Sequence, residues 1–379
     1  MLRAFLLFLL LPAVSAQAAP VPGVARFEQY SSLLRGKRVG LVVNQASLYQ
    51  GKHTIDLLLA KGVRIVKLYA LEHGVRGEGG AGEEIGDSVD EKTGLPIISL
   101  YGARKKPDAA ALAGVDVMVY DIQDVGVRFF TYISSLGLIM EAAAENRVSV
   151  LVLDRPNPNG DYVEGPILKA DCKSFVGAFP IPVVYGMTPG ELAKMIHGER
   201  WQKTPGLELR VVPLAGYDRR EFSFPESRPS PGLRSLQAIR AYPSLALFEP
   251  SIISLGRGTD HPFAQYGIPG EVIGPATFTP RFRPKDQNKL YDGELCHGVE
   301  FHTLAPAAVP RFTTDIFVSA LSKVKRRPFL TNPRFLELLV GDKAVVAGIL
   351  AGKTYAELRR GFAGDLSRFE IARKPYLLY

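Results

Sequence analysis

Short, continuous apolar runs recur along the first half of the chain, and each has the length of a β-strand. They cover residues 37–44, 63–71, 96–101, 115–122 and 148–154. Segments with helical signals lie between and after them, at residues 54–62, 131–147 and 187–199. Continuous apolar strands that alternate with helices are typical of a parallel sheet covered on both faces. The pattern therefore predicts a doubly wound α/β fold for this part of the chain.

The pattern changes at residues 224–232, where Pro and Ser are frequent. We place a domain boundary there, with a sheet domain over residues 24–232 and a second, smaller domain over residues 233–379. The second part has fewer strand signals and is predicted to be α+β. It ends in predicted helices over residues 313–326, 332–341, 342–352 and 354–373.

The chain begins with the features of a secretory signal, in the segment "MLRAFLLFLLLPAVSAQAAP". A positive charge at Arg3 precedes an apolar core, and small residues permit cleavage after Ala16 or Ala18. No cysteine follows the apolar core, and no later apolar stretch reaches the length that spans a bilayer. We therefore expect residues 1–18 to be a signal peptide and the protein to be exported, periplasmic or secreted, without a stable membrane anchor.

Charge and cysteine content narrow the possible partners. The net charge of +8 is scattered over 379 residues, so nucleic acid is not an expected partner outside the cytoplasm. Cys172 and Cys296 either form a disulfide or remain buried thiols, because spacing alone does not decide the pairing. The histidines show no metal-ligand spacing, and we expect neither a metal nor a cofactor.

Polar side chains follow four of the predicted strands where each strand ends. In open parallel sheets, ligands bind outside these carboxyl ends, which right-handed connections bring to one rim. Polar residues also follow strands because loops are exposed to solvent. Four such clusters, each after a strand predicted to be buried, nevertheless favour a binding site. The residues concerned are Asn44, Gln45, Glu72, His73, Asp121, Gln123, Asp124, Asp154, Arg155 and Asn157.

A glycine-rich stretch after the second of these strands allows two interpretations. Gly77, Gly79 and Gly82 have the G-x-G-x-x-G spacing of a dinucleotide-binding loop. Such a loop must follow a strand directly and open a helix, whereas here "EHGVR" intervenes and no helical period follows. We interpret the glycines as a loop that closes over a ligand. The hypothesis of an NAD-dependent oxidoreductase depends on this glycine spacing alone.

The remaining chemistry is that of carboxylates. Glu72 follows an apolar strand, where partial burial would favour its protonated form and suit it to act as a general acid on a leaving oxygen. The alternative is a structural salt bridge between Glu72 and Arg76. We expect the second carboxylate to be Asp121, before Asp124, because neighbouring strand ends share one rim. His73 either orients the acid or contacts the substrate.

Specific motifs extend over nearly the whole chain. They include "GLVVNQ" (40–45), "EHGVRGEGGAG" (72–82), "DVMVYDIQDVGVRFFTYI" (116–133), "VLDRPNPNGDYVEGP" (152–166), "YGMTPGELA" (185–193) and "GRGTDHPF" (256–263). In these motifs the chain resembles the exo-β-N-acetylmuramidases, a glycoside hydrolase family. The resemblance implies a Rossmann-like first domain, a smaller second domain and a cleft between them. It also implies release of N-acetylmuramic acid from the non-reducing end of peptidoglycan fragments, with Glu72 at the position of the family's proposed catalytic glutamate.

The chain departs from the family pattern in two places. Leu71 replaces the proline that usually precedes the E-H-G motif. The segment "EPSIISLGRGT" (249–259) keeps the family's glutamate, arginine and final threonine but has Pro250 and Ile252 where small or polar residues are usual. If this segment lines the sugar pocket, we expect a different substrate preference.

Muramic acid carries a lactyl carboxylate, which an arginine fork can bind. Arg257 is the first candidate because glycines flank it; Arg76 and Arg128 are the others, and Arg128 could equally be structural. The further residues expected to bind substrate are Asn44, Gln45, Gln123, Asp124, Asp154, Arg155, Asn157, Glu164, Glu249 and Thr259. A non-catalytic exported sugar-binding protein is the alternative function, since two α/β domains and an export signal fit that class as well.

Overall fold

The computed structural model describes residues 19–77, 86–221, 224–283, 286 and 289–379. The expected signal peptide and most of the glycine-rich stretch lie outside the described residues. The first part of the chain forms a seven-stranded sheet with the strand order β5-β6-β4-β1-β7-β8-β9. All neighbours pair in parallel except β5 with β6. The strands are β1 (Val39–Val43), β4 (Ile65–Ala70), β5 (Ser88–Val89), β6 (Pro96–Ser99), β7 (Val117–Asp121), β8 (Ser149–Leu153) and β9 (Leu209–Val212).

Alternate residues of the central strands pack into two separate hydrophobic layers. On β1, Val42 belongs to the layer that includes Met140 of α4, whereas Leu41 and Val43 belong to the opposite layer with Leu58 of α2. Both faces of the sheet are therefore buried, which explains why its strands are continuous apolar runs in the sequence. The helices of this part are α1 (Ser31–Leu34), α2 (Thr54–Ala60), α3 (Ala109–Leu112), α4 (Tyr132–Glu145) and α5 (Pro189–Gly198), and a small hairpin joins β2 (Leu48–Tyr49) to β3 (Lys52–His53).

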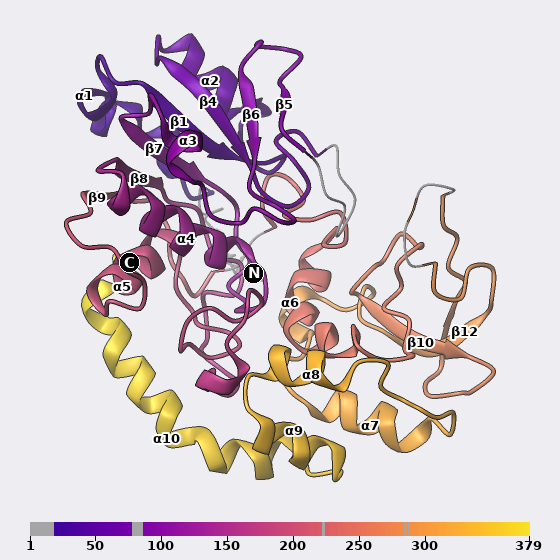
Figure 1. The fold of residues 1–379 in the computed structure, drawn as a ribbon. Coiled ribbons are helices and arrows are strands. Elements are labelled where there is room, and N and C mark those ends of the chain that lie inside the picture. The colour runs from indigo at the N-terminus through magenta and orange to yellow at the C-terminus, as the bar shows by residue number, and fades with distance from the viewer. Residues whose placement is uncertain (1–18, 78–85, 222–223, 284–285, 287–288) are drawn as a thin grey trace, which may run out of the picture.

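The second part of the chain combines helices with a small antiparallel sheet of order β10-β12-β11. Its strands are β10 (Gln265–Pro269), β11 (Ala276–Phe278) and β12 (Cys296–Glu300), and its helices are α6 (Leu236–Leu245), α7 (Asp315–Lys323), α8 (Pro333–Val340), α9 (Lys343–Leu350) and α10 (Tyr355–Arg373). The predicted α/β fold with a smaller α+β part is confirmed. Figure 1 shows that α10 runs back from the second part to the first, so that the C-terminus lies beside α5.

A buried arginine joins the two parts. Arg128 is fully buried and donates four hydrogen bonds of 2.7 to 2.9 Å to main-chain carbonyls. Two of these carbonyls belong to Pro166 and Ile181 in the first part, and two belong to Leu339 and Val340 of α8. Burial lowers the pKa of Arg128 to about 9, which still leaves the side chain charged at neutral pH. Every donor on its two terminal nitrogens is thus directed at the protein, so Arg128 is structural and not a ligand for a substrate carboxylate.

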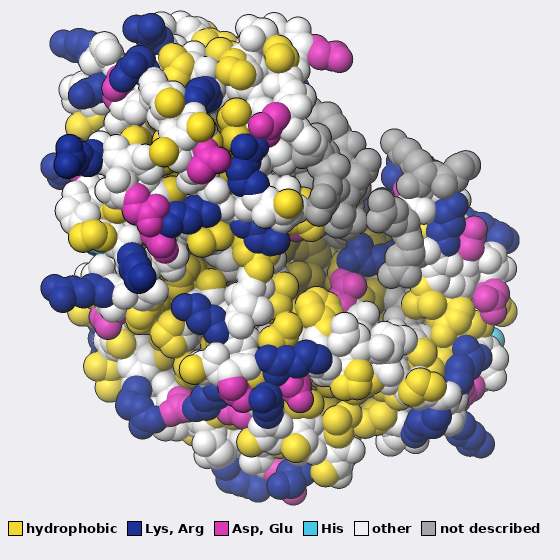
Figure 2. All heavy atoms as spheres, viewed as in Figure 1, with side chains coloured by type: hydrophobic (Ala, Val, Ile, Leu, Met, Phe, Trp, Pro, Cys, Tyr) yellow, Lys and Arg dark blue, Asp and Glu magenta, His cyan; other side chains and the backbone are white. Residues whose placement is uncertain are grey.

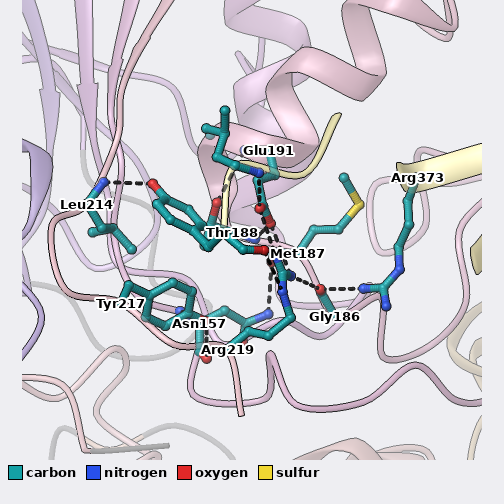
Figure 3. Close-up of polar contacts among 12 residues, drawn as sticks. Asn157, Gly186, Met187, Thr188, Glu191, Leu214, Tyr217, Arg219 and Arg373 are labelled. Atoms are coloured by element: carbon teal, nitrogen blue, oxygen red, sulfur yellow. Dashed lines mark hydrogen bonds and ion pairs between the residues drawn. The ribbon is translucent and has the colours of Figure 1, made fainter. Parts of the chain in front are cut away.

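The end of α10 is fixed to α5 by a polar network (Figure 3). Arg219 and Arg373 both donate to the main-chain oxygen of Gly186, at 3.0 and 2.6 Å. Arg219 also pairs at 2.7 Å with Glu191, which closes the predicted capping box with Thr188. These contacts hold the C-terminal helix against the sheet domain.

Asp154 lies at the centre of the same network. Its Oδ2 accepts hydrogen bonds from the hydroxyls of Thr188 and Tyr379, at 2.7 and 2.8 Å, and its Oδ1 accepts from the main-chain nitrogen of Gly190 at 2.7 Å. The side chain is fully buried. The expected role of Asp154 in sugar binding does not fit this position, because the carboxyl is enclosed by the protein.

Cys172 and Cys296 are free, buried thiols. Burial raises the pKa of Cys296 to about 12. Of the two alternatives, the structure therefore has thiols and no disulfide. No helix in the described part of the chain is long and apolar enough to cross a membrane.

We predict that Asp154→Asn flattens the dependence of stability on pH. Burial raises the pKa of Asp154 to about 7, whereas a carboxyl in an unfolded chain titrates near about 3.9. The folded state binds the proton more tightly, so the contribution of this group is fully present below pH ~4 and is lost as the pH rises towards ~7. The free energy of unfolding in denaturant, measured from pH 4 to 8, should fall less steeply in the variant.

The exposed Asp260 offers a matched control, because Asp260→Asn should keep the slope of the unaltered protein. Parallel pH curves for Asp154→Asn and the unaltered protein would contradict a buried proton at Asp154.

Candidate active site

A tight turn after β4 presents Glu72. The strand ends at Ala70, and the main-chain nitrogen of Gly74 donates to the oxygen of Leu71 at 3.1 Å. His73 has a φ of +74°, a conformation that costs a non-glycine residue about 1–3 kcal/mol and is frequent at functional sites. His73 is buried, and Glu72 is partly exposed. Glu72 therefore belongs to a strained turn that follows β4, and the strand does not continue through it.

The start of α4 positions Glu72. The hydroxyl of Thr131, the residue before the helix, donates to Glu72 Oε2 at 3.4 Å. The hydroxyl of Tyr132 donates to the main-chain oxygen of Glu72 at 3.3 Å. Burial and the neighbouring Glu72 raise the pKa of Tyr132, so its phenol stays neutral and keeps donating. Asn44, at the end of β1, is fully buried beside this group, and its Nδ2 has no hydrogen-bond partner among the described residues.

Aromatic rings lead from this position into the second part of the chain. Phe130 contacts Tyr132 and Tyr242 edge to face, with ring centroids 4.9 and 6.0 Å apart. Tyr242, on α6, contacts Phe263 in the same way at 5.2 Å. The guanidinium of Arg257 lies 4.8 Å from the centre of the Phe263 ring. The rings thus form a continuous wall between Glu72 and Arg257.

Glu249 and Arg257 form an ion pair at the far end of this wall. Glu249 Oε1 lies 2.7 Å from Arg257 Nη2, and the two side chains are 29% and 34% exposed. The pKa of Tyr242 is raised by burial and by both Glu249 and Glu72, and it is lowered by Arg257. Tyr242 is therefore influenced electrostatically by one acid from each part of the chain, Glu72 and Glu249. We call Glu72, Thr131, Tyr242, Glu249 and Arg257 the candidate site.

Figure 2 shows that the molecular surface is hollowed between the two parts, next to the residues drawn in grey. Hydrophobic side chains surround the hollow, with an acidic and a basic side chain among them. A mainly apolar recess with a few charged groups is the usual character of a ligand site.

Asp121, the expected second carboxylate, does not reach this site. It is fully buried at the end of β7, and the guanidinium of Arg155 binds both of its oxygens, at 2.5 and 2.8 Å. Thr54 also donates to Asp121. Such a bidentate, desolvated pair neutralises the carboxylate in place. The expectation that Asp121 is catalytic and that Arg155 binds substrate therefore does not fit the burial of either residue.

Three further residues of the rim are also enclosed by the protein. Asp124 accepts hydrogen bonds from Tyr185 and from the main chain of Gly126, and burial raises its pKa to about 6. Gln123 and Asn157 donate their amide hydrogens to main-chain oxygens. The structure gives these side chains a role in fixing the loops under the site instead of contacting substrate.

Arg76 and Gln45, two further residues expected to bind substrate, contact other groups than those of the candidate site. Arg76 pairs with Asp90 through two contacts of 2.6 and 3.0 Å and lowers the pKa of Asp90 to about 2, so the ion pair that the described residues show for Arg76 is with Asp90. Gln45 lines a pocket of about 470 Å³ with residues of the segment that links the two parts. The other residues that line it are Gly77, Phe224, Glu226, Ser227, Arg228 and Pro231.

Thr259 and Glu164 support the structure around the site. The hydroxyl of Thr259 donates to the oxygen of Gly256 at 2.6 Å and accepts from Gln265, which closes the loop that carries Arg257. Gly256 has a φ of +69°, where a side chain would be strained. Glu164 accepts from Tyr355 and Arg359 of α10, so its contacts fix the C-terminal helix.

Sequence reasoning missed three members of this arrangement. Thr131 and Tyr132 belong to the motif "DVMVYDIQDVGVRFFTYI", but the sequence pattern predicts for them only the start of a helix. Tyr242 lies in no motif, and its proximity to Glu72 depends on how α6 packs against the sheet domain. The ring of Tyr242 contacts Phe129 and Phe130 edge to face, and no local pattern in the sequence predicts these contacts.

Comparison with known proteins identifies the family. The model described as "Exo-beta-N-acetylmuramidase NamZ, N-terminal" matches residues 39–237, and the model of the C-terminal part matches residues 240–379. The peptidoglycan beta-N-acetylmuramidase NamZ of Bacillus subtilis (strain 168) is 36% identical to the chain, over 92% of this chain and 89% of that protein.

Two solved structures share the fold. Both are described as DUF1343 family proteins from Bacteroides fragilis NCTC 9343. The first has a TM-score of 0.86 at 39% identity and covers 96% of this chain and 99% of its own. The second has a TM-score of 0.79 at 30% identity and covers 95% and 99%. The chain thus belongs to the exo-β-N-acetylmuramidase family and is a glycoside hydrolase.

Proposed function

We propose that this enzyme releases N-acetylmuramic acid from the non-reducing end of peptidoglycan fragments, with Glu72 as the general acid. The family and the name of the Bacillus subtilis relative support the substrate class. The position of Glu72 supports its role as the acid. Glu72 lies in a strained turn, is partly exposed and accepts a hydrogen bond from Thr131. An acid held at a fixed position can protonate a leaving oxygen as the glycosidic bond breaks.

Two neighbours help Glu72 in this proposal. The Thr131 hydroxyl donates to Glu72 Oε2, and this contact helps to fix the orientation of the carboxyl that protonates the leaving oxygen. His73 is buried at the strained position of the turn, and we assign it the task of fixing the backbone that presents Glu72. Asn44, which is buried next to Tyr132, supports the same wall of the site.

Arg257 recognises the lactyl carboxylate of the sugar in this proposal. Its Nη2 is bound to Glu249, and no other hydrogen bond of its guanidinium is formed with the described residues. The guanidinium packs on Phe263 and is one-third exposed, so its plane is fixed while donors remain for a substrate carboxylate. A sugar without the lactyl group would leave these donors unused.

The proposed function predicts that the protein hydrolyses a chromogenic aryl β-N-acetylmuraminide and a muramyl disaccharide, and that Glu72→Gln loses most of the second activity. Removal of a general acid costs about two to four orders of magnitude in kcat. The loss should be smaller on the aryl substrate, because a good leaving group needs little protonation. Steady-state kinetics on both substrates measure the difference.

Glu91→Gln is the matched control, because Glu91 is exposed in the same part of the chain. Wild-type kcat of Glu72→Gln on the disaccharide would remove Glu72 from the mechanism. Binding of the sugar by the unaltered protein without any turnover would instead favour a sugar-binding protein.

We predict that Arg257→Lys weakens the preference for muramic acid over N-acetylglucosamine. Lysine keeps the positive charge but loses the planar fork that binds both oxygens of a carboxylate. The ratio of kcat/KM for aryl β-N-acetylmuraminide and aryl β-N-acetylglucosaminide should fall by about tenfold, as expected for the loss of about 1.4 kcal/mol of binding. Arg360→Lys, on the exposed face of α10, should leave the ratio unchanged. An unchanged ratio in Arg257→Lys would count against this role.

We also propose that the protein is exported and acts in the periplasm or outside the cell, where peptidoglycan fragments occur. The motivation is the N-terminal signal pattern. Mass spectrometry of the protein purified from its native host should show cleavage after Ala16 or Ala18. A mature protein that still begins at Met1 would rule out export by this signal.

A further inference from the structure

Hydrolysis of a glycoside generally needs two carboxylates, one on each side of the bond that breaks. The acidic residues of the sheet rim are not available for this task. Asp121 is bound on both oxygens by Arg155, and Asp154 is fully buried within hydrogen bonds. Asp124 is also buried beneath the surface. Among the residues that the structure describes, we therefore look for the partner of Glu72 away from this rim.

Glu249 has the exposure and the environment that this role requires. It follows the short helix η4 (Ala246–Phe248) in the second part of the chain, and its side chain is 29% exposed. Its Oε1 accepts a hydrogen bond from Arg257, and its Oε2 makes no hydrogen bond with the described residues. One oxygen is thus fixed by the protein while the other is left for a water molecule or a sugar.

Glu249 also faces the same groups as Glu72. Arg257, which binds Glu249 Oε1, packs on the ring of Phe263, and Phe263 contacts Tyr242. Tyr242 contacts Phe130, and Phe130 contacts Tyr132, whose hydroxyl donates to the main-chain oxygen of Glu72. Since Glu72 comes from the turn after β4 and Glu249 from the residues after α6, the two acids approach these groups from different parts of the molecule. A sugar bound between the two parts would have one carboxyl on each side.

We infer that Glu249 is the second carboxylate of the reaction. This inference rests on the proposed function. In the reaction, the bond between C1 and the leaving oxygen breaks, its electron pair stays on that oxygen, and the oxygen takes the proton of Glu72. If Glu249 is the base, it takes a proton from the water whose oxygen bonds to C1. If it is the nucleophile, its own oxygen bonds to C1 first, and water then replaces it after giving a proton to Glu72.

Arg257 would connect catalysis with recognition in this arrangement. The same guanidinium holds Glu249 Oε1 and has donors left for the lactyl carboxylate. A substrate that carries this group would thus be bound next to a correctly oriented Glu249, with the guanidinium between two negative charges. Catalysis by Glu249 would be coupled to the presence of muramic acid.

The test uses Glu249→Ala and Glu249→Gln with an aryl β-N-acetylmuraminide that the unaltered enzyme cleaves. We expect kcat to fall by about two to four orders of magnitude in both variants. Added azide should restore turnover in Glu249→Ala and yield the α-configured muramyl azide, because the smaller side chain opens the face opposite the leaving group. Glu249→Gln, which keeps the shape and an oxygen for Arg257, should fold normally and lose the acidic limb of the pH profile of kcat/KM.

Glu294→Ala is the control, because Glu294 is exposed in the same part of the chain. Two results would overturn the inference. One is a kcat within about tenfold of the unaltered enzyme in Glu249→Gln. The other is a loss in Glu249→Ala that azide does not restore and that appears as a raised KM, which would show that Glu249 only orients Arg257. An unaltered enzyme that fails to cleave the aryl substrate would instead remove the proposed function itself.

Discussion

The candidate site is built from two parts of the chain, and a buried guanidinium keeps them in a fixed relation. Arg128 donates to carbonyls of Pro166 and Ile181 on one side and of Leu339 and Val340 on the other. Leaving these buried carbonyls without donors would cost about 1–3 kcal/mol each. The return of α10 to α5 adds a second connection, through Arg219 and the network around Asp154. Groups that must act on one bond can then be held at a constant separation.

The position of the acid depends on how the strands end. Asp121 ends β7 and Arg155 follows the neighbouring parallel strand β8, and the two side chains form a buried ion pair that neutralises both charges. The chain after β4 instead turns sharply, with His73 at positive φ, and this turn directs Glu72 away from the sheet. The residues at adjacent strand ends are therefore buried beneath the site. Its partly exposed charged groups are Glu72, from the turn after β4, and Glu249 and Arg257, from the second part of the chain.

Much of the fold could be predicted from local sequence signals. The apolar runs at 37–44 and 115–122 correspond to β1 and β7, and the capping box at Thr188 and Glu191 marks the start of α5. Signals were too weak for β9 and for the small sheet of β10 to β12, because these strands are short and partly polar or glycine-containing. Their pairing depends on contacts between distant segments.

The site was less predictable than the fold. Motif and chemistry indicate Glu72 and Arg257, and in the structure the contacting rings of Tyr132, Phe130, Tyr242 and Phe263 connect the two residues. The rim residues were expected to contact substrate because they follow strands, but a sequence does not reveal that Asp121 and Arg155, or Asp154 and Tyr379, satisfy each other. Glu249 was expected only as a residue that binds substrate, and Tyr242, which no motif contains, reaches the site through the packing of α6 against the sheet domain. Local sequence patterns do not predict such contacts between distant segments of the chain.

The most direct test of the account is a comparison of two isomeric disaccharides, β-linked N-acetylmuramyl-N-acetylglucosamine and N-acetylglucosaminyl-N-acetylmuramic acid. Products from each, incubated with the unaltered enzyme, are identified by liquid chromatography and mass spectrometry. The account predicts that free N-acetylmuramic acid forms from the first disaccharide and that the second stays intact, because only the first places the lactyl carboxylate on the sugar to be released. Cleavage of the second, or equal cleavage of both, would contradict it.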